Sequence, residues 1–241
     1  MSSLTFREQS SRNIFNNFVK CICSTHHILF IMIKNLLFDF GGVIIDADLP
    51  RAISEFEKLG LKDVASLLNL YTQNGFFLDL EEGKLSRNEF CQKISDNVGR
   101  GVSDNEVEAA WLSIVEKTPL FKLDFLEGLR LKGYNLFLLS NINPFVMDWA
   151  RSSSFSEYGK PLNYYFDKMF CSYEMGVTKP SKEIFDRVIA EAPLLPEETL
   201  FIDDGSRNVE MGRKLGFHVY QPQNREDWRG VVSDVLDSFS F

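Results

Sequence analysis

Short apolar runs alternate along the chain with longer stretches whose apolar residues recur at helical spacing. Runs that are apolar at successive positions are typical of strands buried on both faces of a parallel sheet. The predicted strands are Leu36–Phe40, Asn135–Leu139, Lys168–Ser172, Leu200–Ile202 and Phe217–Tyr220. The alternation of strands with helices predicts an α/β fold in which helices cover the sheet.

The stretches between the strands predict crossover helices, with Gly133 and Gly216 placed where two of them end. The predicted helices are Asp124–Leu131, Pro144–Arg151, Lys182–Ala190 and Ser206–Leu215. We expect residues 225–241 to form a closing helix and residues 152–163, which are rich in Ser, Gly and Tyr, to form a surface loop. The predicted fold is therefore a doubly wound parallel sheet of the Rossmann-like type.

One long gap interrupts this alternation. About 94 residues separate Phe40 from Asn135, whereas a crossover between parallel strands needs only a few tens of residues. Within the gap, several blocks of apolar residues at helical spacing are separated by glycines. We therefore predict an all-helical cap of four or five helices over residues 49–118, inserted into an α/β core formed by residues 32–48 and 119–241.

Residues 1–31 differ in composition from the rest of the chain. Their apolar run Ile28–Ile33 is far shorter than the ~18 to 20 residues that a membrane span needs, and no small-residue cleavage site follows it. A zinc site at Cys21 and Cys23 is disfavoured, because Cys-x-Cys leaves little slack for tetrahedral ligation. We interpret residues 1–31 as an upstream extension or a disordered leader without assigned function, with Met32 as the natural start.

Composition and charge narrow the class of protein. The chain has 241 residues, of which 34 are acidic and 26 basic, so its formal net charge is −8. A net negative field repels a phosphate backbone and argues against a nucleic-acid partner, and no apolar run is long enough to indicate a membrane partner. Four scattered cysteines indicate a reducing compartment, which predicts a cytoplasmic protein.

Polar residues gather at the predicted carboxyl ends of the strands. They are Asp39 after the first strand, Ser140 and Asn141 after the second, Lys179 in the loop after the third, and Asp203 and Asp204 after the fourth. Ligands of open parallel sheets bind outside the carboxyl ends of the strands. We therefore expect these side chains to meet in one site.

The residue types in this site predict phosphoryl-transfer chemistry. Clustered carboxylates repel one another, so they imply a hard, oxygen-preferring cation such as Mg²⁺. An aspartate carries phosphoryl groups covalently, a serine hydroxyl with the next backbone N–H holds phosphate oxygens, and a lysine supplies countercharge. Lys179 at the start of a predicted helix would oppose the helix dipole by about 0.3 to 1 kcal/mol, which favours a functional role. Taken singly, each residue is common in turns and caps.

Four segments in this order resemble the haloacid dehalogenase (HAD) superfamily of Mg²⁺-dependent phosphohydrolases. They are Leu37–Val43, Leu138–Asn141, Thr178–Pro180 and Phe201–Asp204, and the resemblance covers about residues 33 to 225. The resemblance implies Asp39 as the nucleophile that forms an aspartyl-phosphate, and Ser140, Asn141 and Lys179 as phosphate-binding residues. It also implies Mg²⁺ bound by Asp39, the backbone carbonyl of Gly41 and Asp204, with Asp203 and Asn208 in support.

Position 41 departs from the usual family pattern Asp-x-Asp, in which the second aspartate protonates the leaving alkoxide. Gly41 stands there instead, and loss of acid–base help typically costs about 10²- to 10⁴-fold in rate. The chain resembles a branch similar to bacterial sugar-phosphate phosphatases, including a following Asp-x-Asp at Asp46 and Asp48. We expect Gly41 to favour good leaving groups, such as those of sugar 1-phosphates. Asp46 either acts as an acid or base through a water, or its side chain caps the loop that leads into the cap domain.

These observations together predict a cytoplasmic, Mg²⁺-dependent phosphatase for a small phosphorylated metabolite, with a sugar phosphate as the expected substrate. Substrate choice is expected to depend on residues 71–83, including Phe76, Phe77 and Glu82, although aromatic residues at helical spacing are more often core. One alternative is a metal-independent dehalogenase that attacks carbon with Asp39. Another is a catalytically weak phosphate-binding regulatory protein. The sequence does not indicate an oligomeric state.

Overall fold

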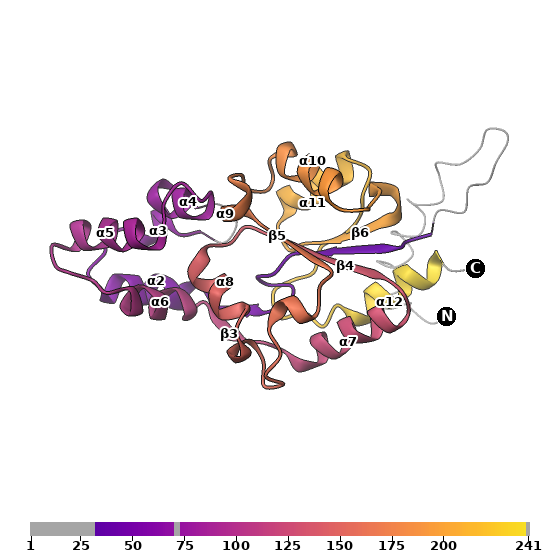
Figure 1. Ribbon diagram of the computed structural model, residues 1–241, viewed down its shortest axis with the longest axis horizontal. Helices are drawn as coiled ribbons and strands as arrows, with labels where there is room; N and C mark the ends of the chain where they lie inside the picture. The colour runs from indigo at the N-terminus through magenta and orange to yellow at the C-terminus, as the bar shows by residue number, and fades with distance from the viewer. Residues whose placement is uncertain (1–31, 70–72, 240–241) are drawn as a thin grey trace, which may run out of the picture. The chain divides into compact units, whose positions relative to one another are not determined.

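The computed structural model describes residues 32–69 and 73–239, so the predicted leader lies outside the described residues. A five-stranded sheet in the order β5-β4-β1-β6-β7 lies at the centre of the fold, and every neighbouring pair in it is parallel (Figure 1). Its strands are β1 (Asn35–Phe38), β4 (Asn135–Ser140), β5 (Lys168–Cys171), β6 (Thr199–Ile202) and β7 (His218–Tyr220). The five predicted strands are therefore confirmed, with ends shifted by one or two residues, and so is the α/β fold class.

Helices cover both faces of this sheet. Leu36 and Phe38 of β1 pack in one core cluster, whereas Leu37 between them packs in the other, because successive strand residues point to opposite faces. All three side chains are fully buried. One face is covered by α7 (Leu120–Leu131) and α12 (Arg229–Ser238), and the other by α10 (Lys182–Glu191) and α11 (Ser206–Lys214) (Figure 1).

The helix starts agree with prediction for α8 and differ for α7 and α12. Helix α7 begins at Leu120, before the predicted Asp124, because its first turn buries Lys122, a residue type that an apolar pattern does not count as core. Helix α8 (Pro144–Ala150) begins as predicted after Asn143, whose side chain accepts a hydrogen bond from the backbone N–H of the third helical residue. Helix α12 begins at Arg229, four residues after the predicted start of the closing helix.

Residues 49–118, which we call the helical insert, contain five helices in their described parts, 49–69 and 73–118. They are α2 (Leu49–Lys58), α3 (Val64–Leu67), α4 (Gly75–Glu81), α5 (Arg87–Val98) and α6 (Asp104–Leu112), and Figure 1 shows them at one end of the sheet. Ser86 and Ser103 each start a helix with a complete capping box, which satisfies orphan N–H groups of the first turn. The prediction of four or five helices agrees with these elements.

Aromatic side chains form the core of the helical insert. Phe56, Phe77, Phe90 and Trp111 are buried and contact one another, with the rings of Phe56 and Phe77 5.1 Å apart in an edge-to-face arrangement. Such pairs contribute about 0.5–1.5 kcal/mol each beyond the area that they bury. Phe77 is thus a core residue, which corrects the prediction that it contributes to substrate choice.

Two strands that the sequence does not predict lie at the two ends of the helical insert. β2 (Asp46–Ala47) and β3 (Val115–Lys117) pair antiparallel where the chain enters and leaves the insert. Ladder hydrogen bonds therefore tie the two connections together. Elements this short have too few residues to show a period, which is why the hydrophobic pattern does not reveal them.

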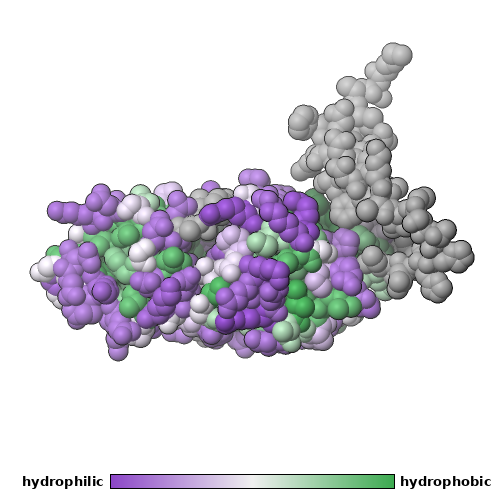
Figure 2. Space-filling view, turned by 90° about the horizontal axis from the view of Figure 1, so that it is seen from above, coloured by the Kyte–Doolittle hydropathy of each residue, from purple (hydrophilic) through white to green (hydrophobic). Residues whose placement is uncertain are grey.

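The remaining segments are short connections. Residues 152–163 do not form a plain surface loop as predicted, because they contain η2 (Ser153–Phe155) and the start of η3 (Leu162–Tyr164), with Phe155 and Leu162 buried. The other two short elements are α9 (Ser172–Met175) and η4 (Pro196–Glu198). No helix in the described ranges is long and apolar enough to cross a membrane. Hydrophilic side chains cover most of the described face in Figure 2, with apolar ones in small groups between them.

Candidate active site

The candidate site lies at the carboxyl ends of β1, β4 and β6. Asp39 follows β1, Ser140 ends β4, and Asp203 follows β6. The backbone N–H of Asp39 donates to the carbonyl of Ile202 over 2.8 Å, which fixes the end of β1 against β6. Strand order reverses at β1, because β4 and β5 extend to one side and β6 and β7 to the other. Such a switch point is where open α/β sheets bind ligands.

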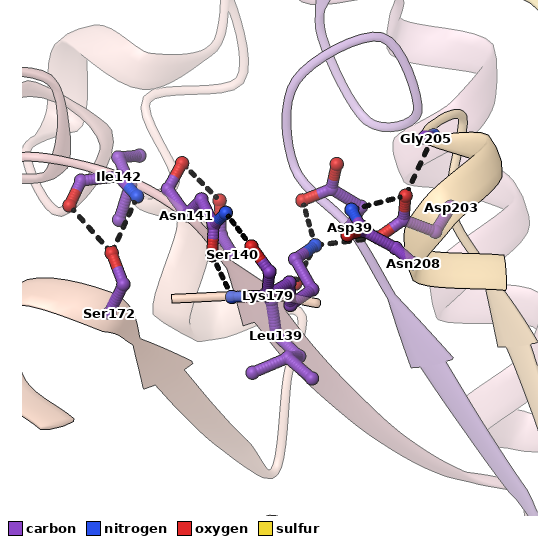
Figure 3. Close-up of polar contacts among 10 residues, drawn as sticks. All are labelled: Asp39, Leu139, Ser140, Asn141, Ile142, Ser172, Lys179, Asp203, Gly205 and Asn208. Carbon is purple, nitrogen blue, oxygen red and sulfur yellow. Dashed lines mark hydrogen bonds and ion pairs between the residues drawn. The ribbon is translucent and has the colours of Figure 1, made fainter. Parts of the chain in front are cut away.

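Lys179 connects the acidic residues at these strand ends (Figure 3). Its Nζ lies 2.9 Å from Asp39 Oδ1 and 2.6 Å from Asp203 Oδ2, and it donates to the Leu139 carbonyl over 2.7 Å. The residue is 3% exposed. Burial lowers its pKa, but Asp203 and Asp39 outweigh burial and raise it above the ordinary value, so the ammonium stays charged.

The position of Lys179 relative to helix α10 differs from prediction. The helix begins at Lys182 and its N-cap is Ser181, so Lys179 lies before the first turn. The ammonium group bonds to the strand ends, as its contacts with Asp39 and Asp203 show. Lys179 therefore does not oppose the helix dipole, because the dipole acts only within the first turn.

Asn141 holds the Lys179 segment in place. Its side-chain amide donates to the Lys179 carbonyl over 2.9 Å and accepts from the Lys179 backbone N–H over 2.7 Å. The Asn141 side chain is thus engaged in positioning, and the prediction of phosphate binding rests on its backbone N–H. Ser140 is 2% exposed, lines the cavity and makes a long 3.4 Å contact to the Asn141 carbonyl.

Ser172 is a positioning residue that the sequence does not single out. Its hydroxyl accepts from the backbone N–H of Ile142 over 2.9 Å and donates to the Ile142 carbonyl over 3.1 Å (Figure 3). These bonds fix the loop after β4 to the first residue of α9. A single serine at a predicted strand end carries no local signal, because its partner lies 30 residues away along the chain.

Asp203 is fully buried and saturated with hydrogen bonds. It accepts from the Gly205 backbone N–H over 2.8 Å and from Asn208 Nδ2 over 3.0 and 3.2 Å, in addition to its ion pair with Lys179. A Cβ at position 205 would lie 2.8 Å from Asn208 Nδ2, so the turn has little room there for a side chain. The predicted supporting residues Asp203 and Asn208 are therefore bonded to each other.

Three carboxylates come together in a geometry that fits a cation. One oxygen each from Asp39, Asp203 and Asp204 lies within 4.8 Å of the others. Burial, then repulsion from Asp39 and Asp203, raises the pKa of Asp204 to about 8. Burial, opposed by Lys179, raises the pKa of Asp39 to about 6. Because a divalent ion would relieve this repulsion and oxygen ligands suit Mg²⁺, the donor set fits that ion.

Glycines at positions 41 and 42 have different structural roles. Gly42 has φ +74°, and a Cβ there would lie 2.4 Å from Asp204 Oδ2, so only glycine allows this approach. Gly41 lies outside the left-handed region, and apart from residues 40–42 no described atom is within 4 Å of the position of its Cβ. Gly41 also lines the cavity. The backbone at position 41 therefore has room for a side chain, and steric hindrance does not explain why glycine replaces aspartate there.

Asp46, the predicted alternative acid or base, is engaged elsewhere. It is 2% exposed in β2, 3.1 Å from the Nζ of the buried Lys122 and 3.3 Å from that of Lys117. It is not among the described residues that line the cavity. Nor does it cap the next helix, because Asp48 accepts the capping hydrogen bond of α2. The contacts of Asp46 therefore indicate a structural ion pair, and its role as an acid or base through a water stays a prediction.

A cavity of about 120 Å³ opens over these residues. The core contributes Asp39, Gly41, Gly42, Ser140, Asn141, Asn143, Lys179, Asp204 and Asn208, and the helical insert contributes Asn69, Gln73, Glu81, Trp111 and Ile114. The predicted segment 71–83 thus reaches the cavity, but through Gln73 and Glu81 and not through Phe76, Phe77 or Glu82. Residues 71 and 72 lie outside the described part of the chain.

Burial gives Glu81 an unusual electrostatic state. The residue is 6% exposed. Burial raises its pKa to about 8 against a hydrogen bond from Gln73, and repulsion from Asp39 adds to the rise. Sequence reasoning missed Glu81, because the local pattern does not distinguish it from its neighbour Glu82.

Comparisons with known proteins agree with this site and fold. The family model of haloacid dehalogenase-like hydrolases matches residues 33–216. The chain is 51% identical to a D-ribitol-5-phosphate phosphatase of Bacteroides thetaiotaomicron, over 86% of this chain and 100% of that protein. A predicted HAD-like family hydrolase of Porphyromonas gingivalis is similar in structure, with TM-score 0.81 and 41% identity over 85% of this chain and 98% of that one.

A further solved structure carries ligands. A HAD family enzyme of Bacteroides thetaiotaomicron, solved as a complex with magnesium and inorganic phosphate, has TM-score 0.76 and 39% identity, over 83% of this chain and 98% of that one. The family model spans well over half of this chain, and its range contains the strand ends that carry Asp39, Ser140, Lys179 and Asp203. The chain therefore belongs to the haloacid dehalogenase-like hydrolase family.

Proposed function

We propose that this protein is a Mg²⁺-dependent phosphohydrolase that removes phosphate from a small phosphorylated metabolite, a sugar or sugar-alcohol phosphate. The 51% identical relative, a D-ribitol-5-phosphate phosphatase, supports this substrate class. The related enzyme in complex with magnesium and phosphate supports the cofactor. The observation that carries the proposal is the placement of Asp39 at the cavity wall, paired with Lys179 and clustered with two further carboxylates.

Asp39 acts as the nucleophile in this proposal. Its side chain is 13% exposed, so it reaches the cavity while most of it is shielded from water. An Asp39 oxygen attacks the phosphorus, the bond from phosphorus to the leaving oxygen breaks, and water then hydrolyses the aspartyl-phosphate. The ion pair with Lys179 favours the carboxylate form that attack requires.

The cation would be held by Asp39, the backbone carbonyl of Gly41 and Asp204, with Asp203 and Asn208 in support. When bound, Mg²⁺ supplies positive charge that offsets the repulsion between the carboxylates and a phosphate dianion. Asp203 and Asn208 support the site through their mutual hydrogen bonds and the bond from the Gly205 N–H to Asp203. Gly42 supports it by leaving space for the Asp204 carboxylate.

The phosphate would be bound by Lys179, Ser140 and the backbone N–H of Asn141. The Lys179 ammonium and the Ser140 side chain both belong to residues that line the cavity beside Asp39. The Asn141 side chain contributes indirectly, because its two hydrogen bonds hold the Lys179 backbone. Fixed donors of this kind stabilise the charge that develops on the phosphoryl oxygens without reorganising.

Residues 49–118 act as a cap in this proposal, and residues 32–48 and 119–241 form the core. The cap role is supported by Gln73, Glu81 and Trp111, which line the same cavity as the strand-end residues. A cytoplasmic location is supported by the two described cysteines, Cys91 and Cys171, which are both free.

Phosphate release tests the proposal. Purified protein is assayed against a panel of sugar and sugar-alcohol phosphates, with Mg²⁺ and with EDTA, and Asp39→Asn serves as the variant that lacks the nucleophile. We expect Mg²⁺-dependent release by the wild type and none above background by Asp39→Asn, whose far-UV circular dichroism should remain native. Unchanged turnover in Asp39→Asn would contradict the mechanism.

The same assay separates the two alternatives. Activity on a haloacid that persists in EDTA would favour the metal-independent dehalogenase, although the acidic pair Asp203 and Asp204 argues against it, since it would repel an anionic substrate. Binding of phosphate esters without any Mg²⁺-dependent release would favour the regulatory protein. We expect neither, because nucleophile, countercharge and cation site occur together.

A further inference from the structure

The proposed reaction lacks a proton donor for the leaving group, since Gly41 occupies the position of the usual acid. The described residues that line the cavity include four charged or acidic ones, Asp39, Lys179, Asp204 and Glu81. The first three belong to the nucleophile, the phosphate site and the cation site. Glu81, from helix α4, is the member of this lining set to which the proposed function assigns no role.

Glu81 is held at the cavity by a small polar network. Its carboxyl receives a hydrogen bond from the Gln73 side chain. Gln73 is itself fixed to the backbone of Asn69, because it donates to the Asn69 carbonyl over 3.0 Å and accepts from the Asn69 N–H over 2.9 Å. A buried carboxyl that is hydrogen-bonded on one side and borders a cavity on the other is positioned to meet a ligand.

The end of helix α4 is fixed against the core. Figure 1 shows α4 beside α9, and the two helices are in contact. Gly83 makes this approach close, because a Cβ at that position would lie 2.1 Å from the Tyr173 carbonyl oxygen. Its φ of +65° also favours glycine. Glu81, two residues earlier, therefore keeps a defined position relative to the strand ends.

Phosphoryl transfer requires an acid on the side of the phosphorus that faces away from Asp39. The attacking and leaving oxygens lie roughly in line through the phosphorus. Asp39 attacks from the strand ends of the core, so the leaving oxygen lies away from the core, toward the helical insert. The hydrolytic water attacks from the position that the leaving group has vacated. One group on that side therefore serves both steps.

We propose that Glu81 is the general acid and base of the reaction, donating a proton to the leaving alcohol and then accepting one from water. This inference rests on the proposed phosphohydrolase function. It places the missing acid on the helical insert and not on the strand-end loop. It also widens the expected substrates from good leaving groups to alkyl phosphates, such as sugar-alcohol phosphates.

Electrostatics at Glu81 are consistent with a proton donor. Burial raises its pKa to about 8, and repulsion from Asp39 on the core and from Glu82, the residue after α4, adds to the rise. The hydrogen bond from Gln73 and the Lys179 ammonium act in the opposite direction. A carboxylic acid that remains protonated near neutral pH can donate its proton, as efficient general acids do.

The proton inventory balances over the two steps. As the bond from phosphorus to the leaving oxygen breaks, that oxygen takes the Glu81 proton, which gives the free alcohol and a Glu81 carboxylate. The carboxylate then takes a proton from water as the water oxygen bonds to phosphorus. The bond from phosphorus to the Asp39 oxygen breaks, releasing phosphate and restoring both the Asp39 carboxylate and the Glu81 acid.

Leaving-group dependence tests this role. D-ribitol 5-phosphate has an alkoxide leaving group that needs a proton, whereas acetyl phosphate leaves as acetate and does not. We expect Glu81→Gln to lower kcat on D-ribitol 5-phosphate by about 10²- to 10⁴-fold and to change kcat on acetyl phosphate by less than about tenfold. Glu82→Gln is the matched control and should leave both rates near wild type, since Glu82 is not among the described lining residues.

Several outcomes are distinguishable. Equal losses on both substrates, or a change in KM alone, would overturn the acid role of Glu81 while leaving the phosphohydrolase intact. A wild type that releases phosphate from neither substrate would count against the proposed function itself. Thermal unfolding of each variant reports folding. If Glu81→Gln does not fold, Glu81→Asp replaces it in the same comparison of the two substrates. The proposed role of Glu81 then requires that Glu81→Asp lowers kcat on D-ribitol 5-phosphate more than kcat on acetyl phosphate.

Discussion

Lys179 is the residue on which the charge balance of the site depends. Its Nζ joins Asp39 and the fully buried Asp203, with distances of 2.9 and 2.6 Å. Replacing Lys179 by an uncharged residue leaves the shielded carboxylates of Asp39 and Asp203 without the ammonium group that pairs with them. We expect Lys179→Met to lower the free energy of unfolding by about 3–5 kcal/mol in urea titrations without Mg²⁺, and to abolish phosphate release. An unchanged urea midpoint would show that the pair does not stabilise the fold.

Position 41 offers a gain of function at the scale of one residue. Apart from residues 40–42, no described atom lies within 4 Å of a Cβ there, and φ is outside the left-handed region, so a side chain fits. If Glu81 is the native acid, the double variant Gly41→Asp/Glu81→Gln should have a kcat on D-ribitol 5-phosphate at least about tenfold higher than that of Glu81→Gln alone. Gly41→Ala in the same background is the control and should restore nothing. Equal effects of Asp and Ala would contradict this explanation.

The titration of Glu81 predicts a pH dependence of stability. Burial raises its pKa from the usual 4.5 to about 8 in the folded chain, so the folded state binds more protons than the unfolded state in that interval. The contribution of neutral Glu81 to stability is full below pH 4.5 and is lost as pH rises to about 8.

This dependence is measured as a difference between two proteins. In EDTA, the free energy of unfolding of the wild type should fall more between pH 5 and pH 8 than that of Glu81→Gln. Asp39 and Asp204 also have raised pKa values and contribute slopes of the same sign, but they do so in both proteins. Parallel curves for wild type and variant would indicate that Glu81 titrates at its usual value.

At the scale of elements, the strands were predictable because each one contains a short run of apolar residues. Leu36, Leu37 and Phe38 are buried on both faces of the sheet, which is the property that the run reveals. The two-residue strand β2 was not predictable, because it is too short to show a period and forms only by pairing with β3, in which Lys117 is the register partner of Asp46. The first turn of helix α7 was not predicted, because it contains the buried Lys122, which a pattern of apolar residues does not count as core.

The site was predictable where its residues end strands and not where they come from the helical insert. Asp39 and Asp203 follow strands and Ser140 ends one, so the general geometry of parallel sheets brings them together. Glu81 depends on how α4 packs against α9, which no local pattern records. Asp46 resembled a catalytic residue in sequence, yet its partners Lys117 and Lys122 are distant along the chain.

The contact between α4 and α9 provides a test at this scale. Gly83 and Gly99 both have positive φ, +65° and +73°, but only at Gly83 would a Cβ meet a backbone atom, 2.1 Å from the Tyr173 carbonyl, whereas no described atom lies within 4 Å at Gly99. Alanine at either position carries the backbone strain, and only Gly83→Ala also separates the two helices.

We therefore expect Gly83→Ala to lower the unfolding free energy by about 1–3 kcal/mol more than Gly99→Ala in urea titrations. Because the helix that carries Glu81 would move, kcat on D-ribitol 5-phosphate should fall in Gly83→Ala and stay near wild type in Gly99→Ala. Equal effects of the two substitutions would show that backbone strain alone, and not the approach of α4 to the core, is important.

At the scale of the whole molecule, the net charge of −8 and the chemistry of the site oppose each other. A protein with a net negative field does not attract phosphate esters over long distances. Binding must therefore rest on local groups, of which Lys179 and the proposed cation are the positive ones at the cavity. The helical insert adds the polar side chains of Gln73 and Glu81 above them, which suits the hydroxyl groups of a sugar or sugar-alcohol phosphate.

Covalent phosphorylation of Asp39 is the central claim, and reductive trapping measures it directly. Wild-type protein turning over D-ribitol 5-phosphate with Mg²⁺ is quenched with borohydride, which reduces an aspartyl-phosphate to homoserine, and peptides are sequenced by mass spectrometry. The expected result is reduction at Asp39, dependent on substrate and Mg²⁺, and lost in Lys179→Met. Steady phosphate release without reduction at Asp39, or with reduction at another carboxylate, would contradict the proposed mechanism.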